Sequence, residues 1–223
     1  LKPGGVTAQY LPLHKMAKAD FRTALATFTE VFPECALFMG VTHGVMVGGR
    51  DSLQFVPERM KQGLASCSLI DDLRMSALDD PVQILGCFLA GGETLSAFAR
   101  QGPSSSDTAD TRLNTDDLPL LDYSGSRGMV HDTWIENMGD LLNLPESSPR
   151  MVVGSGVDEM GYAERIRRSV AVKRLLLKGQ WHARQGDRAR EREAFQEAAS
   201  MDSMDPEVKQ IFGVGGPDSS RPR

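Results

Sequence analysis

Apolar and polar residues in the first part of the chain alternate in runs that predict a strand followed by a helix. Residues 6–11 form a short apolar run after Gly4-Gly5, a pattern typical of a buried strand. Because Pro33 cannot continue a helix, we expect the following helix to end there. Four large apolar residues recur before it at the spacing of one helical face: Phe21, Leu25, Phe28 and Phe32.

Two further apolar runs, residues 36–41 and 44–47, enclose Thr42 and His43 and precede Gly48-Gly49. This spacing predicts a β-hairpin. A strand, a helix and two more strands, with an antiparallel last strand at the edge, are typical of the end of a Rossmann-like methyltransferase sheet. The fold class expected is therefore α/β.

The next residues have a mainly helical pattern. Helices are expected over residues 56–64, 69–78 and 81–98, and Asp80-Pro81 supplies a capping aspartate and a first-turn proline for the third. Residues 101–110 form a polar loop with too few apolar side chains to bury itself. Beyond this loop, Pro119 favours an extended conformation over residues 118–123, and residues 134–144 predict a short helix.

Residues 146–156 are rich in serine, proline and glycine and predict a boundary before a helical tail. Two helices are expected between residues 162 and 212, and they meet at Gly186-Asp187. Gly179 and Phe195 stand where a tetratricopeptide repeat keeps a small residue and its packing aromatic, although an ordinary helical hairpin has the same pattern.

Composition therefore predicts four segments. They are a first domain over residues 1–125, a connecting segment over 126–160, a helical hairpin over 161–213 and a disordered tail over 214–223. Few contacts are expected across the boundary near residue 149.

The charge of the chain limits its partners. The formal net charge is -5 and the pI about 5.4, so no overall basic field favours binding to nucleic acid. Residues 163–193 are locally basic, with ten Lys or Arg against four acidic residues. Such a segment is either a solvated helix surface or a site for an acidic partner or a lipid surface. Three widely spaced cysteines and the lack of a long apolar run favour a reducing, cytoplasmic location.

Few residues in the sequence carry recognisable chemistry. It contains no glycine-rich nucleotide loop after a strand, no G-x-S-x-G elbow and no metal-ligand spacing, so no catalytic, cofactor-binding or metal-ligating residue is assigned. The candidates for substrate binding are Gln9 and Tyr10, at the end of the first strand, and the acidic pair Asp116-Asp117. Carboxylates near the carboxyl edge of a sheet suit the ammonium groups of a polyamine. A turn role for the acidic pair and a satisfied polar group at Gln9 are the alternatives.

Two segments resemble spermidine-synthase-like proteins, in particular the bacterial type that is fused to a transporter-like membrane region. Residues 1–34 contain a GGV-x-x-Q-aromatic-LPL strand and a helix that contains DFR and ends in VFP, and residues 113–123 contain NTDD-x-P-x-acid-aromatic. Leu118 stands where this family has arginine, and the resemblance covers about residues 1–125. The matching residues are Gln9, Tyr10, Asp20, Phe21, Arg22, Val31, Phe32, Pro33, Asn114, Thr115, Asp116, Asp117, Pro119, Asp122 and Tyr123.

The resemblance implies the C-terminal half of a Rossmann-like methyltransferase/spermidine synthase fold, followed here by the α-helical hairpin. It implies aminopropyl transfer from decarboxylated S-adenosylmethionine to a diamine such as putrescine, with the catalytic aspartate and the cofactor loop in the preceding half of the protein.

Because a strand follows Gly4-Gly5 so near the first residue, we expect the chain to belong to a longer protein. Its partners would be the N-terminal half of the same protein and a polyamine, and it would be inactive alone. A membrane anchor upstream and a homo-oligomer are left open. The alternative is a catalytically inactive Rossmann remnant that acts as an interaction module through its basic helical tail.

Overall fold

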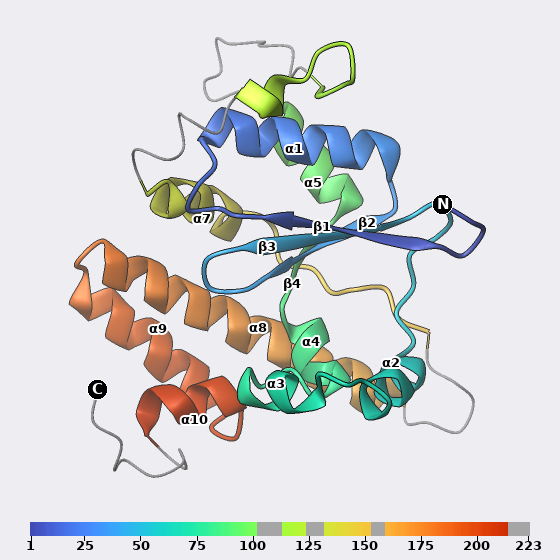
Figure 1. Ribbon diagram of the computed structural model, residues 1–223. Coiled ribbons are helices and arrows are strands. Elements are labelled where there is room, and N and C mark those ends of the chain that lie inside the picture. The colour runs from blue at the N-terminus through green and yellow to red at the C-terminus, as the bar shows by residue number, and fades with distance from the viewer. Residues whose placement is uncertain (102–112, 124–131, 153–158, 214–223) are drawn as a thin grey trace. The chain divides into compact units, whose positions relative to one another are not determined.

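The computed structural model describes residues 1–101, 113–123, 132–152 and 159–213 (Figure 1). The chain forms two compact units, one of residues 1–55 and 88–151 and the other of residues 56–87 and 152–223. None of the helices within the described ranges has the length and apolar character that a membrane crossing requires. Most of the polar loop expected over residues 101–110 and all of the tail expected over 214–223 lie outside the described residues.

Four strands form one sheet in the first unit, and all neighbouring strands in it are antiparallel. They are β1 (Val6–Leu11), β2 (Cys35–Met39), β3 (Gly44–Gly49) and β4 (Phe88–Gly91), in the order β1-β3-β2-β4. Because β3 is antiparallel to both β1 and β2, these two run in the same direction. The helix α1 (Lys18–Val31) joins them, so β1-α1-β2 is a crossover with β3 between its strands. The fold is mixed α/β.

The predicted strands are present, but two expectations about their places in the sheet are wrong. β3 lies between β1 and β2 instead of at the edge. β1 is an edge strand of the described sheet and is largely exposed, with Val6 57% and Tyr10 55% exposed. A short apolar run looks the same in a central and an edge strand, because the neighbours that decide its burial are distant in sequence.

The phenylalanine-rich face of α1 packs inward as predicted. Phe21, Leu25 and Phe28 are at most 8% exposed. Gly48 of β3 allows this helix to approach closely, because a Cβ there would lie 2.8 Å from Phe28 Cε1. The helix α5 (Gly92–Arg100) packs beside α1, on the same side of the sheet (Figure 1).

The prediction of one helix over residues 81–98 is wrong, because β4 interrupts it. The helix α4 (Pro81–Gly86) begins as expected, since the Asp80 carboxylate accepts a hydrogen bond from the Val82 N–H at 2.7 Å. The chain then pairs with β2 before α5 begins at Gly92. Pairing with a strand far earlier in the chain has overridden the local helical pattern.

Two short elements complete the first unit. The helix α7 (Trp134–Leu142) was predicted. The segment Leu120–Tyr123 is a 3-10 helix, in contrast to the extended conformation expected after Pro119. The chain forms a helical turn here because the side-chain oxygen of Asn114 accepts a hydrogen bond from the Leu121 N–H at 2.8 Å.

Helices make up the second unit. They are α2 (Pro57–Ala65), α3 (Ile70–Met75), α4, α8 (Glu159–Arg184), α9 (Arg188–Met201) and α10 (Pro206–Phe212). α8 and α9 form the expected hairpin, in which Gly186 adopts a φ of +78° and Asp187 caps α9. Phe195 packs against Gly179, where a Cβ would lie only 2.2 Å from the ring.

The two units defined by contacts have other boundaries than the segments expected from composition. The expected first domain includes residues 56–87, whose helices group with the C-terminal helices. α4 approaches α8 so closely that a Cβ on Gly86 would lie 2.1 Å from Ser169 Oγ. The boundaries inferred from composition stay predictions that truncation can test.

Candidate functional site

The predicted residues Gln9 and Tyr10 lie near the carboxyl end of β1, and both are exposed. Tyr10 pairs in register with Val45, at the start of β3. Its ring lies against the imidazole of His43, with the ring centroids 5.3 Å apart. The structure therefore joins a residue of the predicted site to one that the sequence left without a role.

Two further polar contacts extend this group. His14 Nδ1 and the Thr42 carbonyl oxygen are 3.3 Å apart, and Thr42 Oγ1 lies 3.2 Å from His43 Nδ1. We call Tyr10, His14, Thr42 and His43 the carboxyl-edge cluster, because β1 and β2 both end beside it. In doubly wound, mostly parallel α/β sheets, ligands bind outside the carboxyl ends of the strands. Here β1 and β2 share that direction, although antiparallel β3 lies between them.

The helix α7 holds the loops that carry this cluster. Asn137 Nδ2 donates hydrogen bonds to the carbonyl oxygens of Leu13 and Met16, at 2.9 and 2.8 Å. The buried Trp134 donates from Nε1 to the carbonyl oxygen of Val41, in the β2–β3 turn. Backbone carbonyls on both loops are thus fixed by one rigid element, which limits the movement of the cluster.

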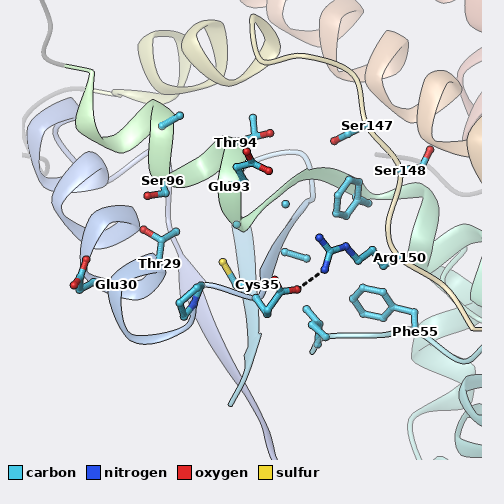
Figure 2. Close-up of a pocket in the computed structure, with 18 of the residues that line it drawn as sticks. Thr29, Glu30, Cys35, Phe55, Glu93, Thr94, Ser96, Ser147, Ser148 and Arg150 are labelled. Carbon is cyan, nitrogen blue, oxygen red and sulfur yellow. Dashed lines mark hydrogen bonds and ion pairs between the residues drawn. The ribbon is translucent and has the colours of Figure 1, made fainter. Parts of the chain in front are cut away.

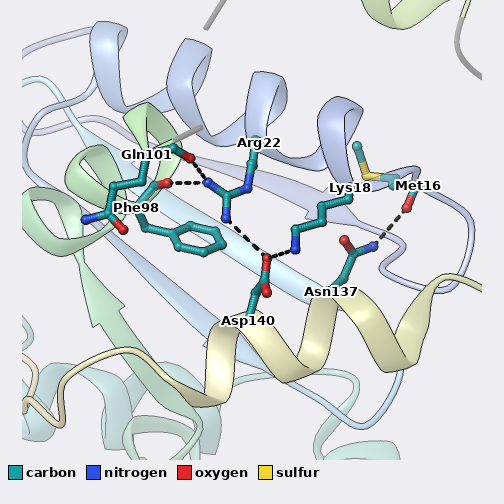
Figure 3. A network of polar contacts seen from close by, with 7 residues as sticks. All are labelled: Met16, Lys18, Arg22, Phe98, Gln101, Asn137 and Asp140. Carbon is teal, nitrogen blue, oxygen red and sulfur yellow. Dashed lines mark hydrogen bonds and ion pairs between the residues drawn. The ribbon is translucent and has the colours of Figure 1, made fainter. Parts of the chain in front are cut away.

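A second network fixes α7 to the two helices above the sheet (Figure 3). The Arg22 guanidinium donates to the carbonyl oxygens of Phe98, at 2.9 Å, and Gln101, and to the Asp140 carboxylate at 3.2 Å. Lys18 also pairs with Asp140, at 2.7 Å. Because Arg22, Phe98 and Asp140 belong to α1, α5 and α7, one guanidinium links three helices.

The predicted acidic pair lies in a turn. Asp116 and Asp117 are both exposed, between Thr115 and Leu118, which exchange two backbone hydrogen bonds. The preceding Asn114 N–H donates to Thr27 Oγ1 of α1 at 2.9 Å. The turn is therefore anchored through Asn114 to the outer part of α1.

The structure brings Tyr10 together with His43, whereas Gln9, the preceding residue of β1, points to the opposite face of the sheet, and neither residue is brought to Asp116-Asp117. Figure 1 shows the segment of residues 113–123 and the sheet on opposite sides of α1. A shared crevice for all four predicted residues is absent from the described part of the chain. The resemblance expected from the sequence grouped both segments, but it contains no information on the helix that separates them.

A separate cavity of about 660 Å³ lies in the first unit, around the first turn of α5 (Figure 2). Its apolar wall includes Phe55 and Phe88. Arg150 at its rim pairs with Glu34 at 2.7 Å. Among the described residues, Ser147 Oγ is buried without a hydrogen-bond partner, and this residue also lines the cavity.

The one thiol in the wall of this cavity is not a nucleophile at neutral pH. Burial, and to a smaller degree the nearby Glu34 carboxylate, raises the pKa of Cys35 to about 12. Because the thiolate is the reactive form of cysteine, Cys35 stays inert. The groups of the cavity that can contact a ligand are therefore its charged and hydroxyl side chains.

Sequence reasoning missed both His43 and the cavity. His43 stands in the turn of the predicted β-hairpin. If the third strand is placed between the first and the second, this turn comes to lie beside the end of the first strand. The cavity depends on β4, which the helical pattern of residues 81–98 concealed. Within the described ranges, no group of three His, Cys, Asp or Glu side chains is arranged to hold a metal ion.

Comparison with protein-family models, with curated proteins and with solved structures finds no match to this chain.

Proposed function

We propose that this chain forms the C-terminal part of a Rossmann-type aminopropyltransferase related to the spermidine synthases. In this proposal the carboxyl-edge cluster forms part of the wall that binds the amine. The supporting observation is the meeting of Tyr10 and His43 at the carboxyl ends of β1 and β2.

The topology supports only the α/β part of the proposal. β1, α1 and β2 form a crossover between two strands that run in the same direction, but β3 lies between them and is antiparallel to both, so the unit is a split β-α-β. The Rossmann part of the proposal rests on the sequence resemblance.

An exposed aromatic ring suits an amine. The face of a tyrosine ring attracts an ammonium group, and a long amine can lay its methylene groups along the same ring. The loops around Tyr10 and His43 are fixed by Asn137 and Trp134, so little conformational entropy is lost when an amine binds. In the intact enzyme, decarboxylated S-adenosylmethionine would supply the aminopropyl group from the part of the fold that carries the glycine-rich loop.

Titration of the purified chain with 1,4-diaminobutane, followed by NMR, tests this proposal. We expect the signals of Gln9, Tyr10 and His43 to shift. Tyr10→Ala should weaken binding about two- to fivefold, whereas Tyr10→Phe, which keeps the ring face, should leave the affinity nearly unchanged.

The control is the double variant Asp116→Asn/Asp117→Asn, because these acids lie across α1 from the cluster. It should leave the Tyr10 and His43 shifts unchanged. A diamine that shifts no signal of the cluster, or that binds the alanine and phenylalanine variants equally, would count against the proposal.

The alternative, an interaction module that uses the basic tail, has less support from the geometry. Lys173 and Arg174 belong to the basic segment but are only 4% and 6% exposed, and Lys173 pairs with Glu207. Arg167 and Arg188 each pair with an acid three residues away. Much of the positive charge is thus used inside the helical unit.

A further inference from the structure

The cavity at the start of α5 carries charges of both signs around an apolar wall (Figure 2). Three carboxylates and two guanidinium groups line it. Arg100 pairs with Glu30 at 3.6 Å and Arg150 with Glu34 at 2.7 Å, which leaves Glu93 without an ion pair among the described residues. The two ion pairs balance four of these five charges, and Glu93 carries the remaining negative charge of the lining.

Arg150, on the positive side of the cavity, has N–H donors that its described contact does not use. A guanidinium presents five N–H donors, and the described contact of Arg150 with Glu34 uses one of them. Ser147 and Ser148 precede Pro149 and Arg150 in the chain, and the Ser147 oxygen has no hydrogen-bond partner in the described structure. A carboxylate would satisfy these groups, because arginine and hydroxyl donors bind carboxylates well.

The negative side is provided by Glu93. It lies in the first turn of α5, is exposed, and lines the same cavity as Arg150 (Figure 2). Its carboxylate can accept hydrogen bonds from an ammonium group. Phe55 and Phe88 add an apolar surface to the lining, on which an aromatic or long aliphatic group can pack.

We infer that this cavity binds a zwitterionic α-amino acid with an aromatic side chain. The carboxylate of the ligand faces Arg150 and the serine pair, its ammonium group faces Glu93, and its ring lies on the phenylalanine wall. A cavity of about 660 Å³ lies within the size range of small-molecule sites. This site is separate from the carboxyl-edge cluster, so the inference does not depend on the proposed transferase function.

Three probes that differ only in charge test the inference. Isothermal titration of the chain with L-phenylalanine, phenylethylamine and 3-phenylpropionate compares the zwitterion with its cationic and anionic analogues. We expect L-phenylalanine to bind at least about tenfold more tightly than either analogue, because each analogue leaves one charged side of the cavity without a partner.

Two variants test which side chain contacts the ammonium group of the ligand and which contacts its carboxylate. Glu93→Gln should weaken L-phenylalanine binding by about tenfold and leave 3-phenylpropionate binding unchanged or stronger. Arg150→Gln should weaken L-phenylalanine to a similar degree and leave phenylethylamine binding unchanged or stronger. Matched controls are Glu136→Gln, which removes the first-turn acid of α7, and Arg50→Gln, an exposed arginine of the same unit outside the cavity. Both controls should keep the affinity of the unaltered chain.

Several results would overturn the inference. They are a dissociation constant for L-phenylalanine weaker than about 10 mM, equal affinity for the three probes, and equal loss in the variants and in their controls. Circular dichroism of each variant shows that its fold is intact, and all four substituted side chains are exposed.

Discussion

At the scale of single residues, Arg22 joins three helices of the first unit. Its side chain is only 12% exposed, and its guanidinium lies 4.3 Å from the centre of the Phe98 ring while it donates to two carbonyl oxygens and one carboxylate. The sequence indicated this arginine only as part of a family pattern. The structure gives it a structural role, as the link among α1, α5 and α7.

We expect Arg22→Lys to lower the free energy of unfolding by about 1–3 kcal/mol, because lysine keeps the charge but cannot make several hydrogen bonds in fixed directions. The fluorescence of the buried Trp134 during urea unfolding, in a Trp181→Phe background, reports on this unit. The control is Arg100→Lys, since Arg100 is 71% exposed and has one long ion pair with Glu30. It should change stability by less than about 0.5 kcal/mol. Equal effects of the two substitutions would contradict the role given to Arg22.

At the scale of elements, close helix packing in the second unit depends on small residues at particular positions. Gly179 faces the Phe195 ring, and Gly86 faces Ser169 of α8. The sequence pattern indicated the first of these pairs through its likeness to a tetratricopeptide repeat. An isolated hairpin cannot bury its own faces, and here α10 and α4 pack against α8 and α9 to cover part of them.

Gly179→Ala should destabilise the second unit by about 1–3 kcal/mol, because the added Cβ would overlap the Phe195 ring and force α8 and α9 apart. The matched control is Gly63→Ala in α2, where no atom lies within 4 Å of the added Cβ. That substitution should stabilise the protein by about 0.5–1 kcal/mol through helix propensity alone. Urea unfolding followed by circular dichroism measures both. A stabilising Gly179→Ala would show that the hairpin is packed more loosely than described.

At the scale of the whole molecule, the second unit is assembled from two separate parts of the sequence. Residues 56–87 pack with residues after 152, although the first unit lies between them in the chain. Val82 and Leu85 of α4 are at most 6% exposed, and α4 packs mainly on α8. Composition predicted a boundary near residue 149 with few contacts across it, whereas these contacts predict that the C-terminal helices support residues 56–87.

A chain truncated after residue 148 should therefore lose structure in residues 56–87. We expect trypsin to cut at Arg59, Lys61 and Arg74 at least about tenfold faster than in the full chain, because α4 loses the apolar surface that buries it. Mass spectrometry of the fragments identifies the cut sites. Truncation after residue 213, which removes none of the described residues, should leave the rates unchanged. If residues 56–87 resist trypsin equally in both truncated chains, the division suggested by composition is the correct one for folding.

The sequence by itself determined the elements whose signals are local. The apolar spacing of Phe21, Leu25 and Phe28 predicted α1, Asp80-Pro81 predicted the start of α4, and Gly186-Asp187 predicted the turn between α8 and α9. These signals suffice because helical periodicity and caps act within a few residues. Tertiary structure alone decided that residues 88–91 form a strand, that β1 lies at an edge, and that Tyr10 meets His43. Strand pairing joins residues far apart in the chain, so the partner that decides each of these features cannot be found from the segment itself.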